Sequence, residues 1–319
     1  MQRLTYILFI LVSQVSYSQI CDGTKVLLLD TLVSDGDEWV LKFEDDFIDT
    51  TLDLSKWVIR ESHQGNADGT GAFLTLDNVS VSPESYSAHS NSATGVCIVT
   101  LKKETVVRPA IFWDPLSPVN SYHYTTADLW SKEHFGWGKY EIRCRIPKGK
   151  NFTSAFWLYG QENNRGDEID VFEFMEEKDV LSKYDSDKRC KYIQQHFHQW
   201  NKSDPLNPLD RNCGTTHKTK IDYSLDFHTY TLIWDRWGIS WFVDGQFIKL
   251  VPQWIDLNGG AITKNNIKPS QVVIRNDWYP INDMSIIFGC GIQTENGTDD
   301  PSDFPGLMIV DYVKFYEKK

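Results

Sequence analysis

The sequence has only one long apolar run, and it lies at the N-terminus. Residues 6–12 read YILFILV and follow Arg3, but the run is too short to span a bilayer. Small residues follow at Ser16-Tyr17-Ser18, with the spacing that a signal peptidase prefers. We therefore expect residues 1–18 to be a signal peptide, and the protein to be secreted, periplasmic or held at the cell surface. We expect no segment to span a membrane.

Basic residues are scarce relative to acidic ones. The chain has 32 Lys and Arg against 44 Asp and Glu, which gives a formal net charge of −12. Such a surface repels the phosphate backbone of nucleic acids and anionic lipid headgroups. Nucleic acid and anionic membranes are therefore poor candidates as partners, and we expect a monomer.

Motifs of metal-binding cysteines are also lacking. The six cysteines form no Cys-x-x-Cys pair and no Cys/His cluster, so a zinc site is not indicated. An even number of cysteines in an exported chain permits disulfide bonds. Cys190 and Cys213 enclose a polar loop and are the pair that we predict. Cys144 alternates within an apolar strand pattern, and we expect it to be a buried thiol.

Long helical periodicity, internal repeats and low-complexity linkers are absent. Instead, short segments rich in β-branched and aromatic residues alternate in polarity, as in residues 140–146 and 230–234. Residues 241–248 contain an Asp-Gly pair, which is typical of a two-residue hairpin turn. Many short strands between turns predict an all-β sandwich. We expect an N-terminal extension over residues 19–38 and a single domain over residues 39–319.

Three carboxylates lie within one apolar segment, Glu168-Ile169-Asp170-Val171-Phe172-Glu173. On a regular strand, alternation places Glu168 and Asp170 on the same face. Glu173 is five positions from Glu168 and would point to the other face. One β-bulge near Val171 and Phe172 would return it to the face of the other two acids. The segment therefore predicts a bulge and three acids along one groove.

Paired carboxylates suit the hydrolysis of glycosidic bonds. In a retaining enzyme, one carboxylate attacks the anomeric carbon and the other protonates the leaving oxygen, at a separation of about 5–5.5 Å. Crowding of like charges raises the pKa of at least one carboxyl, which can then stay protonated near neutral pH. On spacing alone, a solvated acidic strand face or a calcium site fits the three acids equally well.

The same segment resembles the signature of glycoside hydrolase family 16, in the form that carries one extra residue at a bulge. Further blocks that resemble the family follow in family order, at residues 43–47, 52–57, 135–143, 146–149, 154–158, 226–230, 233–234 and 310–316. The resemblance implies a concanavalin-like β-jelly-roll sandwich with a cleft on its concave face. It also implies that Glu168 is the nucleophile, Asp170 its assisting carboxylate and Glu173 the general acid/base.

Four residues of these blocks match substrate-binding positions. Trp137 and Trp157 match aromatic positions on which a sugar ring could stack, and Phe156 would then face the core. Glu141 and Arg143 share a strand face and match polar positions of the cleft. A surface salt bridge of little energetic weight is the alternative for this pair.

Two further groups could hold ligands. His196 and His198 share a face on the next strand, where the family often supplies a cleft histidine, and we expect one of them in the cleft. The two could also bind a metal, but the sequence identifies no third ligand. Glu44 and Asp311 resemble the terminal acids that hold a structural calcium in many family members. We expect no other cofactor.

These observations together predict a retaining endo-glycosidase. Its substrate would be a polysaccharide with internal β-1,3 or β-1,4 bonds, either a β-glucan or a red-algal galactan. A lectin on the same sandwich is the first alternative, although binding alone needs neither a nucleophile nor an acid. A transglycosylase is the second, and it would share all three acids. The sequence leaves the choice between glucan and galactan open.

Overall fold

The computed structural model describes residues 23–27, 38–63, 71–82, 95–109, 116–163, 165–174, 190–201, 209–293 and 299–319. The predicted signal peptide lies outside these ranges. Within them, the only helical elements are short 3-10 turns such as Leu76–Asn78 and Pro301–Asp303. No helix in the described ranges is long and apolar enough to cross a membrane.

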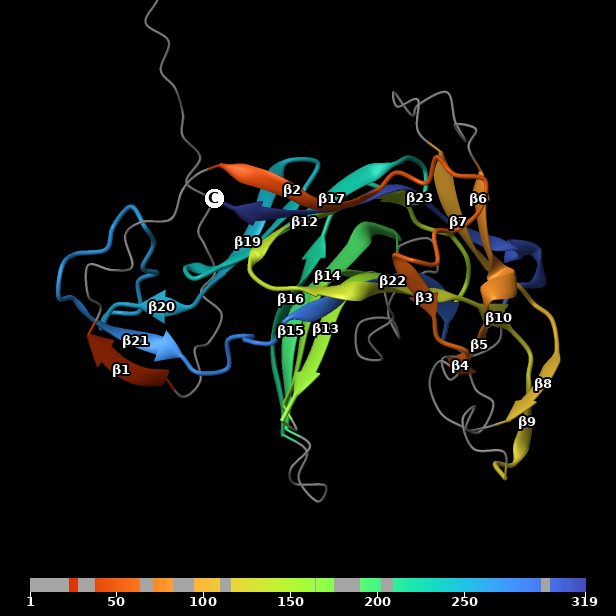
Figure 1. The fold of residues 1–319 in the computed structure, drawn as a ribbon, viewed down its shortest axis with the longest axis horizontal. Coiled ribbons are helices and arrows are strands. Elements are labelled where there is room, and N and C mark those ends of the chain that lie inside the picture. The colour runs from red at the N-terminus through yellow and green to blue at the C-terminus, as the bar shows by residue number, and fades with distance from the viewer. Residues whose placement is uncertain are drawn as a thin grey trace, which may run out of the picture.

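Two antiparallel sheets form the body of the molecule and lie one above the other (Figure 1). The seven-stranded sheet has the order β16 (Leu209–Lys218), β15 (Tyr192–Asn201), β14 (Arg165–Phe174), β13 (Phe152–Glu162), β22 (Met284–Ile292), β11 (Asp128–Phe135) and β3 (Trp57–Ile59). The eight-stranded sheet has the order β19 (Gln246–Pro252), β18 (Gly238–Val243), β17 (His228–Asp235), β12 (Gly138–Arg145), β23 (Gly306–Lys318), β7 (Val96–Leu101) and β6 (Val79–Ser82), and β2 (Trp39–Asp45) also pairs with β23.

Three small sheets flank these two (Figure 1). They consist of β1 (Gly23–Leu27), β21 (Val272–Asn276) and β20 (Trp254–Ile255); of β10 (Thr125–Thr126), β5 (Phe73–Leu74) and β4 (Ser62–His63); and of β8 (Val106–Pro109) with β9 (Val119–Tyr122). Strand β1 belongs to the predicted N-terminal extension, and it pairs along its whole length with β21. Part of the extension therefore joins a sheet.

The hydrophobic core lies between the two large sheets. Strands such as β12 and β13 bury every second side chain in it, because successive side chains of a strand point to opposite faces. On β12, Tyr140 and Cys144 are fully buried, and on β13 the same is true of Phe156 and Leu158. The predicted all-β sandwich is confirmed. Trp57, Trp234 and Trp241 are also fully buried in this core, so part of the tryptophan content serves packing.

The predicted disulfide bond is wrong. Cys190 and Cys213 are both thiols, and both are buried in the core cluster. Cys144 is a buried thiol, as predicted, and so are Cys97 and Cys290. Burial disfavours the thiolate, and it raises the pKa of Cys290 to about 12. These five cysteines pack as small apolar side chains.

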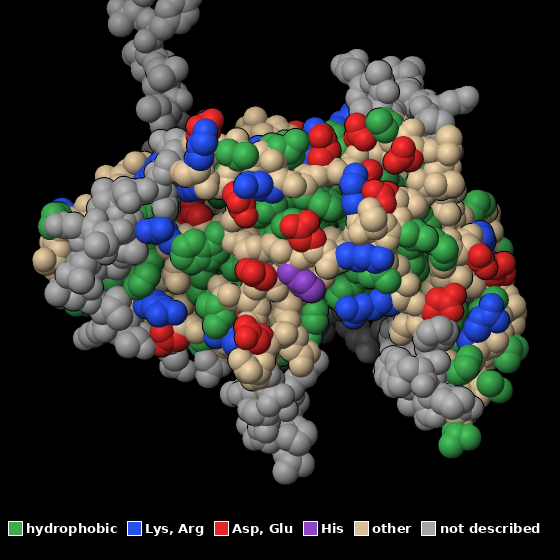
Figure 2. Space-filling model, in the orientation of Figure 1, with side chains coloured by type: hydrophobic (Ala, Val, Ile, Leu, Met, Phe, Trp, Pro, Cys, Tyr) green, Lys and Arg blue, Asp and Glu red, His purple; other side chains and the backbone are tan. Residues whose placement is uncertain are grey.

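Acidic and basic side chains are interspersed on the face of the molecule that Figure 2 shows. The negative charge of the chain is therefore not gathered into one acidic patch on that face.

Candidate active site

The predicted bulge is present, and its extra residue is Val171. Trp157 of β13 lies opposite Asp170, and the preceding Phe156 lies opposite Phe172. Val171 therefore has no counterpart on β13. Val171 and Phe172 are consecutive, yet both belong to the core cluster, which a regular strand does not allow. The irregularity is thus a genuine bulge of β14.

Two buried side chains hydrogen-bond to the backbone of the bulge. Trp241, from β18 of the opposite sheet, donates its indole N–H to the carbonyl of Asp170 at 2.8 Å. Gln195, from β15, donates its amide to the carbonyl of Val171 at 3.3 Å. A bulge disrupts the ladder locally, and its carbonyls need other partners when they are buried. The core itself thus helps to hold the bulge in place.

The bulge brings the three acids to one cavity. Glu168, Asp170 and Glu173 all line a cavity of about 400 Å³ on the face of the seven-stranded sheet that is turned away from the core. We call it the acid cavity. Asp170 is only 2% exposed, while Glu168 and Glu173 are partly exposed. Trp157 lines the same cavity, as predicted. Asp128 of β11 adds a fourth carboxylate, which the sequence analysis missed.

Asp170 has a perturbed pKa. Burial raises the pKa of Asp170 well above its ordinary value, and the charge of Glu173 raises it further, with a smaller contribution from Glu168. His198 opposes this rise in the pKa. Its Nε2 lies 3.3 Å from Asp170 Oδ2. Asp170 therefore keeps its proton to a higher pH than an exposed aspartate does.

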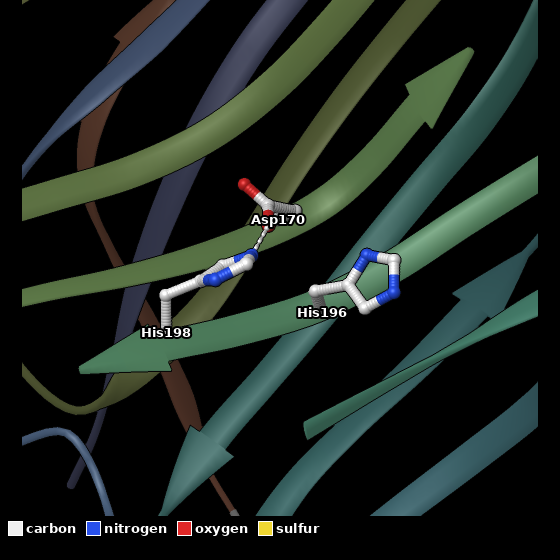
Figure 3. Close-up of side chains that lie close together, drawn as sticks. All are labelled: Asp170, His196 and His198. Atoms are coloured by element: carbon white, nitrogen blue, oxygen red, sulfur yellow. Dashed lines mark ion pairs between the residues drawn. The ribbon is translucent and has the colours of Figure 1, made fainter. Parts of the chain in front are cut away.

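Both predicted histidines reach the acids, where only one was expected. They extend from β15 on the same side, and Figure 3 shows His198 directed at Asp170. Nδ1 of His196 lies 3.5 Å from Oε2 of Glu173. Gly214 lies opposite His196 on β16, where a Cβ atom would come within 1.4 Å of His196 Cδ2. The absence of a side chain at Gly214 leaves room for the imidazole ring.

Asp170 also supplies the third potential metal ligand that the sequence did not identify. One ligand atom from each of Asp170, His196 and His198 lies within 4.8 Å of the others, and Figure 3 shows the three side chains together. This is the only group of three such ligands in the described ranges. It lies among the three acids, where each histidine already contacts a carboxylate.

The predicted calcium ligands lie elsewhere, and each is paired with a cation. Oε1 of Glu44 is 2.8 Å from Nζ of Lys314. Asp311 is 1% exposed and forms an ion pair with Arg143. Neither acid belongs to the group of three ligands found in the described part of the chain.

Glu141 and Arg143 do not reach the acid cavity, so their prediction as cleft residues is wrong. They lie on β12, which belongs to the eight-stranded sheet, and they alternate there with buried core residues. Their side chains therefore point away from the core, on the far side of the sandwich from the three acids. Glu141 accepts a hydrogen bond from Tyr312 at 2.9 Å. Arg143 forms its ion pair with Asp311. The two residues thus lie on the outer face, as in the alternative, but with partners other than each other.

Trp137 also lies outside the acid cavity. It occupies the turn between β11 and β12 and is 47% exposed. It borders a different cavity. The aromatic wall next to Trp157 consists instead of Trp130 and Tyr159, whose ring centroids lie 5.5 and 6.1 Å from that of Trp157. The guanidinium of Arg60 lies 3.6 Å from the ring centroid of Trp130. Arg60 and Tyr159 were missed because no motif marks them.

Clustered carboxylates beside Trp157, on the face of an all-β sandwich, are the arrangement expected of a glycoside hydrolase. Residues 55–279 match the family model of glycosyl hydrolases family 16. The match covers more than two thirds of the chain, and the chain belongs to this family. The predicted family is thus confirmed.

Relatives of this chain act on different polysaccharides. The chain is 26% identical over 214 residues to a glucan endo-1,3-beta-glucosidase of Cryptopygus antarcticus, which covers 65% of this chain and 67% of the relative. It is 25% identical to glucan endo-1,3-beta-glucosidase A1 of Niallia circulans, over 88% of this chain and 38% of the relative. It is 25% identical to a kappa-carrageenase of Pseudoalteromonas carrageenovora, over 89% of this chain and 66% of the relative. The chain thus spans about two thirds of the first and third relatives and well under half of the second.

Solved structures confirm the jelly-roll fold. The catalytic domain of a laminarinase from Thermotoga petrophila superposes with a TM-score of 0.60 at 22% identity, over 88% of this chain and 99% of that chain. The kappa-carrageenase of Pseudoalteromonas carrageenovora in complex with an oligotetrasaccharide also gives 0.60, at 19% identity, over 92% of this chain and 100% of that chain. At these identities the likeness concerns the fold alone.

Proposed function

We propose that this protein is a secreted, retaining endo-glycosidase that hydrolyses internal β-1,3 or β-1,4 bonds of a β-glucan or a galactan. The observation that carries the proposal is the bulge at Val171, which turns Glu173 to the cavity face that holds Glu168 and Asp170. Relatives named as glucan endo-1,3-beta-glucosidases and as a kappa-carrageenase support the substrate class. The predicted signal peptide suits a polymer that is too large to import.

The reaction has two steps. In the first, the Glu168 carboxylate attacks the anomeric carbon while protonated Glu173 gives its proton to the leaving glycosidic oxygen. The glycosidic bond breaks and a glycosyl ester of Glu168 forms. In the second, the Glu173 carboxylate takes a proton from a water molecule, which attacks the same carbon and releases Glu168. Two inversions at the anomeric carbon retain its configuration.

The neighbours of these two glutamates support their roles. Because burial favours the protonated form of Asp170, this residue adds little negative charge between the glutamates and can donate a hydrogen bond to the Glu168 carboxylate. His196, at 3.5 Å from Glu173, orients the acid/base and can hydrogen-bond to it. Trp157 presents an aromatic face on which the CH face of a sugar can stack.

Substitution of the two glutamates tests the assignment. Glu168→Gln and Glu173→Gln should each lower the turnover of a β-glycan by at least about 100-fold, because each removes one reacting carboxylate. The measurement is sizing of products from laminarin, mixed-linkage β-glucan and kappa-carrageenan. Glu317→Gln is the matched control, since Glu317 pairs with Lys42 at the surface of the eight-stranded sheet. Near-normal turnover by a folded Glu168→Gln or Glu173→Gln variant would contradict the assignment.

Product analysis separates retention from its alternatives. Proton NMR of a fresh digest should show the β-anomer of the new reducing end first, before mutarotation. An α-anomer that appears first would overturn retention but leave hydrolysis. Binding without cleavage of any of the three polymers would favour the lectin, and products longer than the substrate would favour the transglycosylase.

A further inference from the structure

A second cavity, of about 640 Å³, opens beside the turn between β11 and β12. None of its lining residues belongs to the acid cavity. We call it the Trp137 cavity, after the exposed tryptophan in its wall. Its wall includes tryptophan, arginine and glutamine side chains, namely Trp137, Trp234, Arg236, Gln253, Trp254 and Arg275.

Two tryptophans give this cavity flat apolar surfaces. Trp137 is 47% exposed, and Trp254 is partly exposed. The Trp254 ring is held in place by a 2.7 Å hydrogen bond from its Nε1 to the carbonyl of Arg236. Trp137 also borders a smaller neighbouring cavity, which is lined on its other side by Trp39. Exposed, fixed indole rings are surfaces on which the CH faces of pyranose rings stack.

Three buried polar atoms in the wall have no hydrogen-bond partner within the described ranges. They are Nε1 of Trp234, Oε1 of Gln253 and Nε of Arg275. The side chains of Trp234 and Gln253 are only 1% and 6% exposed. A buried donor or acceptor without a partner is unfavourable, and a ligand can supply the missing hydrogen bond. Two donors and one acceptor match hydroxyl groups, because a hydroxyl both donates and accepts.

We infer that the Trp137 cavity is a second glycan-binding site, which takes a short run of pyranose units from the same polymer that the acid cavity cleaves. A sugar ring stacks on Trp137, and its hydroxyls bond to Trp234, Gln253 and Arg275. This inference rests on the proposed function for the identity of the polymer. Arg236 and Arg275 outnumber the single acid of the wall, Asp283, so sulphated sugars fit as well as neutral ones.

A second site changes how the enzyme handles long chains. Once one part of a polymer is bound in the Trp137 cavity, another part meets the acid cavity at a raised effective concentration. A short oligosaccharide cannot reach both sites and gains nothing. The Trp137 cavity should therefore lower KM for the polymer and leave both kcat and the KM for short substrates unchanged.

Trp137→Ala tests this with Phe247→Ala as its matched control. Phe247 lies on β19 and is also 47% exposed, but it borders neither cavity. Trp137→Ala should raise KM for the polymer by about tenfold without a change in kcat or in the kinetics of a short oligosaccharide. Unchanged polymer KM in a folded Trp137→Ala variant overturns the inference and leaves the proposed function intact. An equal loss of kcat/KM on short and long substrates also overturns the inference.

Binding without catalysis makes the inference independent of cleavage. In the Glu168→Gln background, native gels that contain laminarin or kappa-carrageenan should retard the protein. Adding Trp137→Ala should weaken this retardation at least about threefold, while adding Phe247→Ala should not. Retardation by laminarin alone identifies a neutral glycan, and retardation by kappa-carrageenan alone a sulphated one. If both double variants are retarded equally, the inference of a second site is wrong. It is also wrong if neither polymer retards the protein.

Discussion

Asp170 is the one acid of the three that is fully buried, and its neighbours shift its pKa in opposite directions. Burial and the two glutamates favour its protonated form, whereas His198 at 3.3 Å favours the carboxylate. Burial is the largest of these effects, so the pKa of Asp170 rises. A buried carboxyl that keeps its proton stabilises the folded chain at low pH, and this makes Asp170 a source of pH-dependent stability.

Asp170→Asn should flatten the dependence of stability on pH. In the unfolded chain the pKa of Asp170 is near its ordinary value of 3.8, and in the folded chain it is raised. Between these two values the folded state binds more protons, so stability falls as the pH rises through the folded pKa. Melting temperatures from about pH 4 to pH 8 should fall less for Asp170→Asn than for the wild type. Parallel melting curves for the two proteins would contradict a raised pKa.

Strand β14 shows how one extra residue is accommodated within an element. Residues on both sides of Val171 keep the register of a regular strand, since Asp170 lies opposite Trp157 and Phe172 opposite Phe156. The extra residue is pushed into the core, where Val171 is 1% exposed. Because the bulge removes Val171 from the alternation of faces, two glutamates five positions apart point to the same face.

Deletion of Val171 should leave the three acids on the cavity face. The flanking pairs with β13 would become consecutive, and Glu173 would keep its side of the sheet. We expect a loss of stability of about 1–3 kcal/mol from the missing core side chain, with hydrolysis still measurable. Deletion of Ile169 is the control, because it reverses the orientation of Glu168 relative to Asp170 and should abolish activity. The comparison requires the melting temperature and the turnover of both variants.

A folded deletion of Val171 that is as inactive as Glu173→Gln would contradict this view of the bulge. It would mean that the position of Glu173 depends on the irregular backbone itself and not only on the face to which it points.

In the described part of the chain, the two sheets are held together by packing and not by disulfide bonds. The five described cysteines are thiols buried in the structure, although the chain is predicted to be exported. Burial raises the pKa of Cys97 and Cys144 far above that of an exposed thiol, so they are poor nucleophiles in the folded state. Reactivity of these thiols therefore reports on the integrity of the whole sandwich.

Alkylation followed by mass spectrometry should show this directly. Iodoacetamide should leave the five described cysteines unmodified in the native protein and should modify all five after denaturation without a reductant, because burial and not oxidation protects them. A reducing agent should not change the melting temperature. A peptide that links Cys190 to Cys213 would contradict the structure.

Alternation of polarity along the chain was enough to predict the strands, and the spacing of the three acids predicted a bulge. These features follow from alternation along one segment, which is a local property of the backbone. The spacing of Glu168 and Glu173 was therefore enough to predict a bulge near Val171 and Phe172, and the ordered blocks were enough to indicate the family.

Tertiary packing sets which sheet each strand joins and which side chains meet. Alternation says that Glu141 and Arg143 share a face, but it does not say that this face lies on the opposite side of the sandwich from the acids. In the same way, the pairing of β15 with β14 brings both His196 and His198 to the acids, where the sequence supported only one. The position of Trp137 beside a second cavity likewise comes from the packing of segments far apart in the chain. Such choices depend on non-local pairing, which the period of a strand does not encode.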